Sequence, residues 1–208
     1  MAQKLCTIMV LLVAMIASAQ KQREPLLKLD HNDLTVLGIT IGSSTKQSVI
    51  QQLRDAPTFK TRHNDDTICY RAEADQDDTV VAFYFGALGG WMDVTEISIS
   101  TSKDLPWRVA HCKRSHLVSR DLQFLRGLTL GSGMTEVIHA LGPPSHSKNN
   151  RLSYFTSHDC PHDLVSSEQA KDKKSSLQPS CEVVDSVETI FTQNEGLNFI
   201  TFYHYIDQ

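Results

Sequence analysis

A short pattern bounded by glycines occurs twice in this sequence, and it constrains the fold more than any other feature. Residues 38–42 read Gly-Ile-Thr-Ile-Gly, and residues 127–131 read Gly-Leu-Thr-Leu-Gly. Each copy is followed by serine, a Val-x-x-x-Leu spacing and a proline. The sequence therefore predicts two similar modules in tandem, an arrangement that more often builds a binding surface than an active site.

The N-terminal residues have the pattern of a secretory signal peptide. Lys4 precedes an almost unbroken apolar run over residues 5–17, and residues 17–19 form a small-x-small cleavage site. The apolar run is too short and wrongly flanked for a membrane-spanning helix. We therefore expect residues 1–19 to be removed on export, no spanning segment in the mature chain, and a periplasmic or secreted protein.

The charge distribution argues against nucleic acid as a partner. The chain has 20 lysines and arginines against 24 aspartates and glutamates, a formal net charge of −4. The basic group Lys171, Lys173 and Lys174 stands beside Asp172 and Glu168. Phosphate binding needs concentrated positive charge, so we expect neither nucleic acid nor an anionic membrane surface as a partner.

Four cysteines follow the predicted signal peptide: Cys69, Cys112, Cys160 and Cys181. An even number of cysteines in an exported chain is typical of disulfides. Three pairings are possible. We favour Cys69–Cys112 and Cys160–Cys181, because each bridge then stays within one module.

After each glycine pattern, the hydrophobic period changes from that of a helix to that of strands. Val49 and Leu53 are four residues apart, as are Val137 and Leu141, which is the spacing of one helix face. The alternating segments that follow predict antiparallel strands joined by hairpins around Gly90 and Gly196. These strands are expected over residues 67–73, 79–85, 93–100, 151–156, 187–192 and 199–206.

The ends of the two helices have recognisable signals. Ser43 or Ser44 is expected to cap the first helix, and Thr135 the second. Pro57 ends the first helix, and the Gly-Pro-Pro sequence of residues 142–144 ends the second.

The expected fold class is α+β, with two tandem modules that each pack one helix on a small antiparallel β-sheet. Residues 20–118 form the first module with its connector, and residues 119–208 form the second. A polar segment from residue 157 to about 185 is inserted in the second module, and Cys160 and Cys181 bracket it. We interpret it as a stapled surface loop or, alternatively, as a binding loop.

The order glycine, helix, proline, tyrosine and glycine hairpin resembles the module shared by β-lactamase inhibitor proteins and the small lipoprotein of the outer-membrane barrel-assembly machinery (SmpA/OmlA-like). The resemblance covers most of the mature chain, and its motifs are structural. Inhibitor proteins of this type are tandem two-module chains with two disulfides, which this chain is similar to. It departs from the lipoprotein in having two modules and no lipidated cysteine. The matching positions are Gly42, Val49, Leu53, Pro57, Tyr70, Phe83, Phe85, Gly90, Ile97, Gly131, Val137, Leu141, Pro144, Tyr154, Ile190, Gly196 and Tyr203.

No arrangement of reactive residues in the sequence indicates an active site. Four cysteines that pair leave no free thiol for nucleophilic catalysis. The sequence contains neither a Gly-x-Ser-x-Gly elbow nor a phosphate-binding Gly-x-x-x-x-Gly-Lys loop. The acidic pairs at residues 65–66 and 77–78 are expected in solvated turns. We therefore predict that the protein is not an enzyme and uses no cofactor.

The strongest metal candidate is the sequence His-Asp-Cys-Pro-His-Asp at residues 158–163. Imidazole, thiolate and carboxylate groups are ligands for zinc or copper. A structural site needs four convergent ligands and Cys160 is expected in a disulfide, so we predict no metal site. A periplasmic protein that binds a metal or small ligand through His158 and His162 remains the alternative function.

A contact surface is predicted from the last strand of each module. Aligning Gly90 with Gly196 places Ile97 and Ile99 at the positions of Tyr203 and Tyr205, which are therefore expected to face the core. Phe202 and His204 then replace Glu96 and Ser98 on the other face. With Tyr84 or Trp91 at the hairpins, Phe202 and His204 form the predicted aromatic surface; alternatively, they pack between the modules.

The function expected from the sequence is therefore non-catalytic recognition of another exported or envelope protein. Two roles fit this expectation, an inhibitor of a secreted or envelope enzyme and a factor in envelope assembly. The residues predicted to bind the partner are Tyr84, Trp91, Phe202 and His204.

Overall fold

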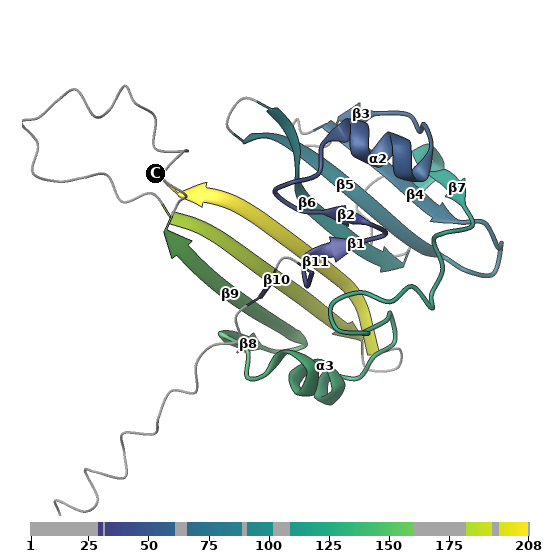
Figure 1. Cartoon of the computed structure of the whole chain (residues 1–208). Helices are drawn as coiled ribbons and strands as arrows, with labels where there is room; N and C mark the ends of the chain where they lie inside the picture. Colours follow the sequence, from purple (N-terminus) through teal and green to yellow (C-terminus); the bar gives the residue numbers. More distant parts are fainter. Residues whose placement is uncertain are drawn as a thin grey trace, which may run out of the picture.

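The computed structural model describes residues 29–30, 32–60, 66–88, 91–101, 109–159, 182–192 and 196–207. Their main element is one nine-stranded sheet, ordered β3-β4-β5-β6-β11-β10-β9-β8, with β7 beside β4 (Figure 1). A separate two-stranded ribbon, β1-β2, precedes it. The strands are β1 (Thr35–Val36), β2 (Ile39–Thr40), β3 (Phe59–Lys60), β4 (Asp66–Ala72), β5 (Thr79–Leu88), β6 (Trp91–Thr101), β7 (Lys113–Ser115), β8 (His146–Lys148), β9 (Arg151–Asp159), β10 (Glu182–Thr192) and β11 (Gly196–Asp207).

The α+β class expected from the sequence is wrong. The fold is mostly antiparallel β-sheet, with 52% of the described residues in strands and 14% in helices. The described residues contain two α-helices of eight residues each, α2 (Lys46–Leu53) and α3 (Met134–Leu141), and one short 3₁₀ turn at Val109–His111. The expected separate small sheets are also wrong, because β6 of the first half pairs with β11 of the second and makes the sheet continuous.

The strands are longer than the sequence predicts, which explains the high strand content. β10 extends from Glu182 and β9 to Asp159, so both run into the segment that we expected to be an inserted loop. The signal-peptide region, the hairpin turn at residues 89–90, Cys160 and Cys181 lie outside the described residues.

The first helix begins at a different cap from the one expected. The Thr45 hydroxyl accepts a hydrogen bond from the Ser48 N–H at 3.3 Å, and the Ser48 hydroxyl accepts one from the Thr45 N–H at 3.3 Å. Ser44 instead accepts from the Thr40 N–H at 2.9 Å and so closes the preceding glycine turn. Val49 and Leu53 are buried, as their spacing predicts.

The second helix also differs from the expectation only at its start. Gly133 takes the N-cap position, and its N–H donates to Glu136 Oε2 at 2.9 Å, so Thr135 is not the cap. Val137 and Leu141 are buried against the sheet. The helix ends at Gly142, whose φ of 77° is a conformation that favours glycine.

The repeated glycines have a definite structural task, which is to attach a turn to the last strand of each half. The Gly42 N–H donates to the Val94 carbonyl at 2.8 Å, and the Val94 N–H donates to the Ser44 carbonyl at 2.8 Å. In the second half the same pair of bonds has lengths of 2.7 and 2.9 Å and joins Gly131, Leu197 and Ser132.

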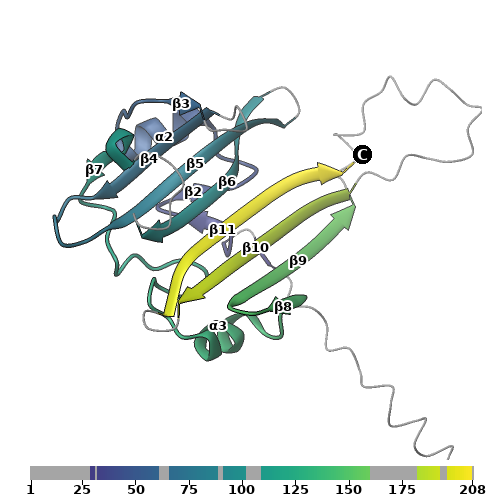
Figure 2. The ribbon, with the colours of Figure 1, turned by 180° about the vertical axis from the view of Figure 1, so that it is seen from behind.

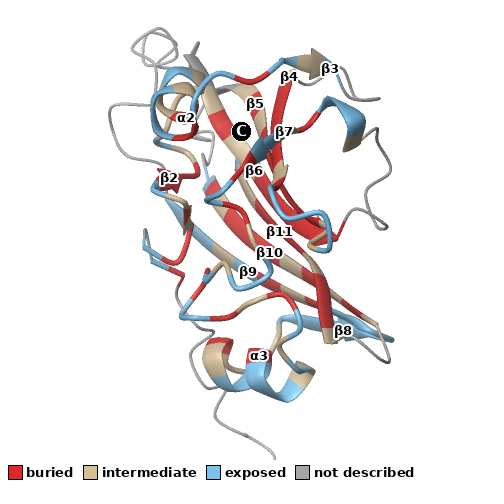
Figure 3. Cartoon of the chain, turned by 90° about the vertical axis from the view of Figure 1, so that its right-hand side faces the viewer, coloured by how far each residue is buried: buried red, intermediate tan, exposed pale blue. Residues whose placement is uncertain are grey.

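The main hydrophobic cluster lies between the sheet and the segments that cover one of its faces. Phe83, Ile97, Phe202 and Val187 contribute to it from four different strands and are completely buried. Buried positions, coloured red in Figure 3, occur along the central strands. The ribbon β1-β2 and helix α2 lie in front of the strands in Figure 1 and behind them in Figure 2. We call the opposite side, where the 3₁₀ turn and Cys112 pack against Val80 and Ala82, the outer face of the sheet.

The predicted disulfide Cys69–Cys112 is confirmed. It connects β4 to the residue before β7, and β7 then pairs with β4 in parallel. Both cysteines are buried with Val80 and Ala82 in a small second cluster, separate from the main one. Among the described residues, neither helix is long and apolar enough to cross a membrane.

Candidate binding surface

A row of aromatic side chains crosses the outer face of the sheet. Successive side chains on a strand point to opposite faces, so Tyr84 and Tyr203 point away from the face that Phe83 and Phe202 share with the core. Direct pairing partners point to the same face. From β3 to β9 the directly paired residues are Phe59, Thr67, Tyr84, Glu96, Tyr203, Ser186 and Phe155.

We call Phe59, Tyr84, Tyr203 and Phe155, together with Tyr205 two residues beyond Tyr203, the aromatic row. Phe155 and Tyr205 are 46% and 47% exposed, among the few large apolar side chains of the described residues that face solvent to this extent. Tyr84 and Tyr203 are partly buried. The row is therefore most accessible on β9 and β11, in the second half of the chain.

Tyr203 in the middle of the row keeps a neutral hydroxyl group at ordinary pH. Burial raises the pKa of Tyr203 to about 12, and the negative charges of Glu96 and Glu188 act in the same direction. The Tyr84 hydroxyl lies 3.5 Å from the Ser98 hydroxyl. A tyrosine hydroxyl can donate and accept a hydrogen bond, while its ring offers apolar contact area.

Smaller side chains occupy the neighbouring positions on the same face. Ala82, Ser98 and Thr201 are directly paired across β5, β6 and β11, and all are buried. Glu188 on β10 is paired with Thr201 and forms an ion pair with Arg151 on β9 at 3.0 Å. The aromatic row is therefore flanked by small groups and by a charged pair.

The four residues predicted to bind a partner do not lie together. Tyr84 belongs to the aromatic row. Trp91 begins β6, opposite Leu88, and its side chain lies outside the described part of the structure. Phe202 is completely buried and meets Phe124 edge-on, with ring centroids 6.4 Å apart. The burial of Phe202 favours the alternative that it packs in the core, so it offers no surface to a partner.

His204 points to the same face as Phe202 and is also removed from the aromatic row. Its Nδ1 lies 2.6 Å from Asp185 Oδ1, and the side chains are 18% and 8% exposed. Asp93 is close enough for electrostatic interaction: burial raises the pKa of Asp93, and the charge of His204 opposes that shift. The imidazole also packs on Gly42, so it connects the first glycine turn to the last two strands.

The expectation that Tyr203 and Tyr205 face the core is wrong. Phe202 pairs with Ile97, and Ile200 with Ile99, so these four residues share the core face. The hydrogen bonds of the glycine turns show that Val94 corresponds to Leu197, which differs by an odd number of residues from the alignment of Gly90 with Gly196. An odd shift reverses every side chain of a strand.

Phe155, Tyr203 and Tyr205 were missed by the sequence analysis. The alternation in β11 contained the signal, because aromatic residues occupy adjacent positions from Phe202 to Tyr205 and half of them must face away from the core. The sequence does not show which of these side chains face the core, because that depends on the register of β11 against its neighbouring strands. Phe155 follows the buried Tyr154 in the same way.

The alternative metal site can be examined only in part. His158 is exposed near the end of β9, and His162 lies outside the described residues. Where the structure describes the chain, no three histidine, cysteine, aspartate or glutamate side chains gather in a way that could hold a metal ion.

The chain matches no protein-family model, no curated protein and no solved structure. The support for the candidate binding surface therefore comes from the geometry of this chain and not from a related protein.

Proposed function

We propose that this chain is an exported, non-catalytic protein-binding protein, and that the aromatic row contacts another exported or envelope protein. The observation that carries the proposal is the alignment of Tyr84, Tyr203 and Phe155 across five strands of one sheet, with Tyr205 beside them. The partner is either an enzyme that the protein inhibits or a component of envelope assembly.

Aromatic side chains are suited to this task because they combine a large contact area with few rotatable bonds. Tyrosine, tryptophan and phenylalanine are enriched in protein interfaces, and a few such residues commonly supply most of the binding energy. A sheet also holds their positions fixed, which reduces the entropy lost on binding. The half-exposed rings of Phe155 and Tyr205 are the expected anchors.

Two sequence features support the same proposal. The resemblance of the repeated module to β-lactamase inhibitor proteins favours protein recognition, and the signal-peptide pattern favours an exported partner. Because fold resemblance transfers poorly to function, the choice between inhibitor and assembly factor depends on the identity of the partner.

The test is affinity capture by the purified, oxidised protein from envelope and secreted fractions of the producing cell, followed by direct binding measurement with the captured partner. We expect Tyr205→Ala and Phe155→Ala each to weaken binding about tenfold or more, which corresponds to at least ~1.4 kcal/mol. Their melting temperatures should stay close to that of the unmodified protein, because both rings are half exposed.

The matched control is Ile138→Ala, which removes a 37% exposed apolar side chain from helix α3. This control should bind the partner as tightly as the unmodified protein does. Equal binding by all three variants would show that the partner uses another surface. Absence of any competable partner would count against stable protein recognition.

A further inference from the structure

Two arginines occupy directly opposite positions on neighbouring strands of the sheet. Arg71 on β4 and Arg114 on β7 are partners in the parallel ladder. Like charges placed opposite each other in a sheet are destabilising. The backbone hydrogen bonds between β4 and β7 do not require arginine at either position. The presence of two opposed arginines therefore needs another explanation.

Among the described residues, an acidic partner is found for only one of these arginines. Arg114 Nη2 donates to Asp75 Oδ1 at 2.6 Å, and its Nη1 donates to the Glu73 carbonyl at 2.8 Å. The Nε of Arg71 is buried and has no hydrogen-bond partner in the part of the chain that the structure describes. Buried polar groups nearly always have a partner, and an orphan often marks the place of an ion, a water or a ligand.

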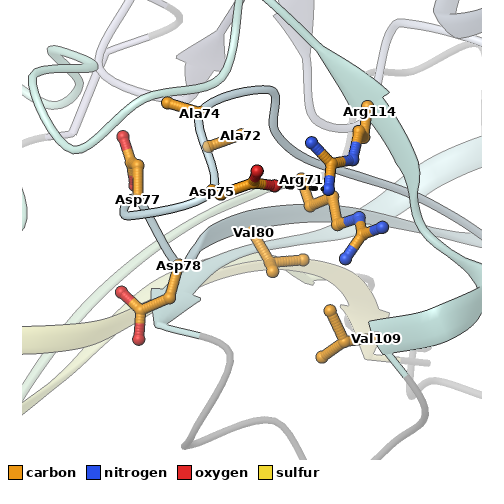
Figure 4. Close-up of a pocket in the computed structure, with 9 residues that line it drawn as sticks. All are labelled: Arg71, Ala72, Ala74, Asp75, Asp77, Asp78, Val80, Val109 and Arg114. Atoms are coloured by element: carbon orange, nitrogen blue, oxygen red, sulfur yellow. Dashed lines mark hydrogen bonds and ion pairs between the residues drawn. The ribbon is translucent and has the colours of Figure 1, made fainter.

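Both side chains line a hollow beside the β4–β5 turn. Its volume is about 130 Å³, whereas one water needs only about 10–15 Å³. Figure 4 shows the two guanidinium groups near each other, with Asp75 beside Arg114. Val80 and Val109 form the apolar part of the wall.

The remaining acidic residues of the hollow do not neutralise Arg71. The Asp77 carboxylate accepts hydrogen bonds from the Thr79 N–H at 2.9 Å and from the Arg120 N–H at 2.8 Å. The Asp78 carboxylate points away from both guanidinium groups in Figure 4. Asp75 is 84% exposed, so its ion pair with Arg114 is weak and open to competition.

We propose that Arg71 and Arg114 form a binding site for an oxyanion, either a carboxylate or a phosphate group. A guanidinium group donates two parallel hydrogen bonds to such an anion, and two guanidinium groups can hold it from different sides. The anion would accept hydrogen bonds from both guanidinium groups and offset the repulsion between the arginines. The site goes beyond the proposed partner surface, because none of its lining residues belongs to the aromatic row.

The experiment is a titration of the oxidised ¹⁵N-labelled protein with inorganic phosphate and, separately, with acetate, at constant ionic strength. We expect saturable shifts of the amide signals of β4, β7 and the turn between β4 and β5. Saturation by phosphate alone assigns a phosphate site, by acetate alone a carboxylate site, and by both a general oxyanion site. Failure of both anions to give a saturable shift at millimolar concentration overturns the proposal.

Two variants separate a defined site from a general effect of charge. Arg71→Gln should weaken the anion affinity at least tenfold, whereas Arg120→Gln removes the same charge nearby without altering the lining of the hollow. Equal weakening by both variants would overturn the proposal. If Arg71→Gln fails to fold, Arg71→Lys keeps the charge but loses the guanidinium fork, and it should still bind the anion more weakly than the unmodified protein.

Discussion

At the scale of single residues, Gly42 shows how a repeated glycine can have an additional role in one copy. Its φ of 73° already favours glycine. A Cβ at this position would also lie 2.7 Å from the His204 ring. The ring cannot move away easily, because its other side is held by the 2.6 Å contact with Asp185. The residue thus lets the first glycine turn approach the last strand closely.

This arrangement predicts that Gly42→Ala is more destabilising than substitution of a glycine that differs only in its surroundings. Gly127 is the matched control, since its φ is 83° and an added Cβ would meet nothing within 4 Å. We expect Gly127→Ala to lower the free energy of unfolding by about 1 kcal/mol and Gly42→Ala by about 2–4 kcal/mol. Urea unfolding measures both. Equal losses would show that the contact with His204 has no energetic weight.

At the scale of secondary-structure elements, most strands could be predicted from alternation and most helical faces from spacing. The buried pairs Val49 and Leu53, and Val137 and Leu141, follow directly from the helical period. The cap of the first helix was not predictable, because serine and threonine occur at several adjacent positions and any of them could accept the first N–H. The second helix begins at Gly133, which has no side chain that could indicate a cap. The faces of β11 were not predictable, since an odd error in alignment exchanges them.

The disulfide leads to a prediction about the stability of the protein. Cys69 and Cys112 are 43 residues apart, and their bridge holds the β7 segment against β4. Replacing both by alanine should lower the free energy of unfolding by roughly 3–4 kcal/mol, mainly through the greater entropy of the unfolded chain. Urea titration under oxidising conditions, with the unmodified protein as reference, measures the loss. A change below about 1 kcal/mol would mean that the bridge constrains the unfolded chain little.

At the scale of the whole molecule, the pairing of β6 with β11 joins the two halves. Ile99 lies opposite Ile200 and Ile97 opposite Phe202, and all four belong to the same buried cluster. The cluster also takes Val49 from α2 and Val137 from α3. Because packing and backbone bonds both cross the junction, the two halves share the main hydrophobic cluster.

We therefore predict a single cooperative unfolding transition. Amide signals from β5 and β10, one strand from each half, should disappear at the same urea concentration. Ile97→Ala removes a completely buried side chain at the junction and should destabilise both sets of signals equally, by about 2–5 kcal/mol. Two separate midpoints, or a shift confined to β5, would show that the halves unfold independently.

The sequence by itself determined where most strands and both helices lie and which side of each helix is buried, and it favoured the Cys69–Cys112 pairing. These properties depend on local spacing, which a reader can count along the chain. Only the tertiary structure decided that the two halves share one sheet and that Tyr203 and Tyr205, rather than Phe202, face away from the core. Both outcomes depend on the register between strands distant in sequence. That register is set by the backbone bonds of the glycine turns to Val94 and Leu197 and by packing across β6 and β11.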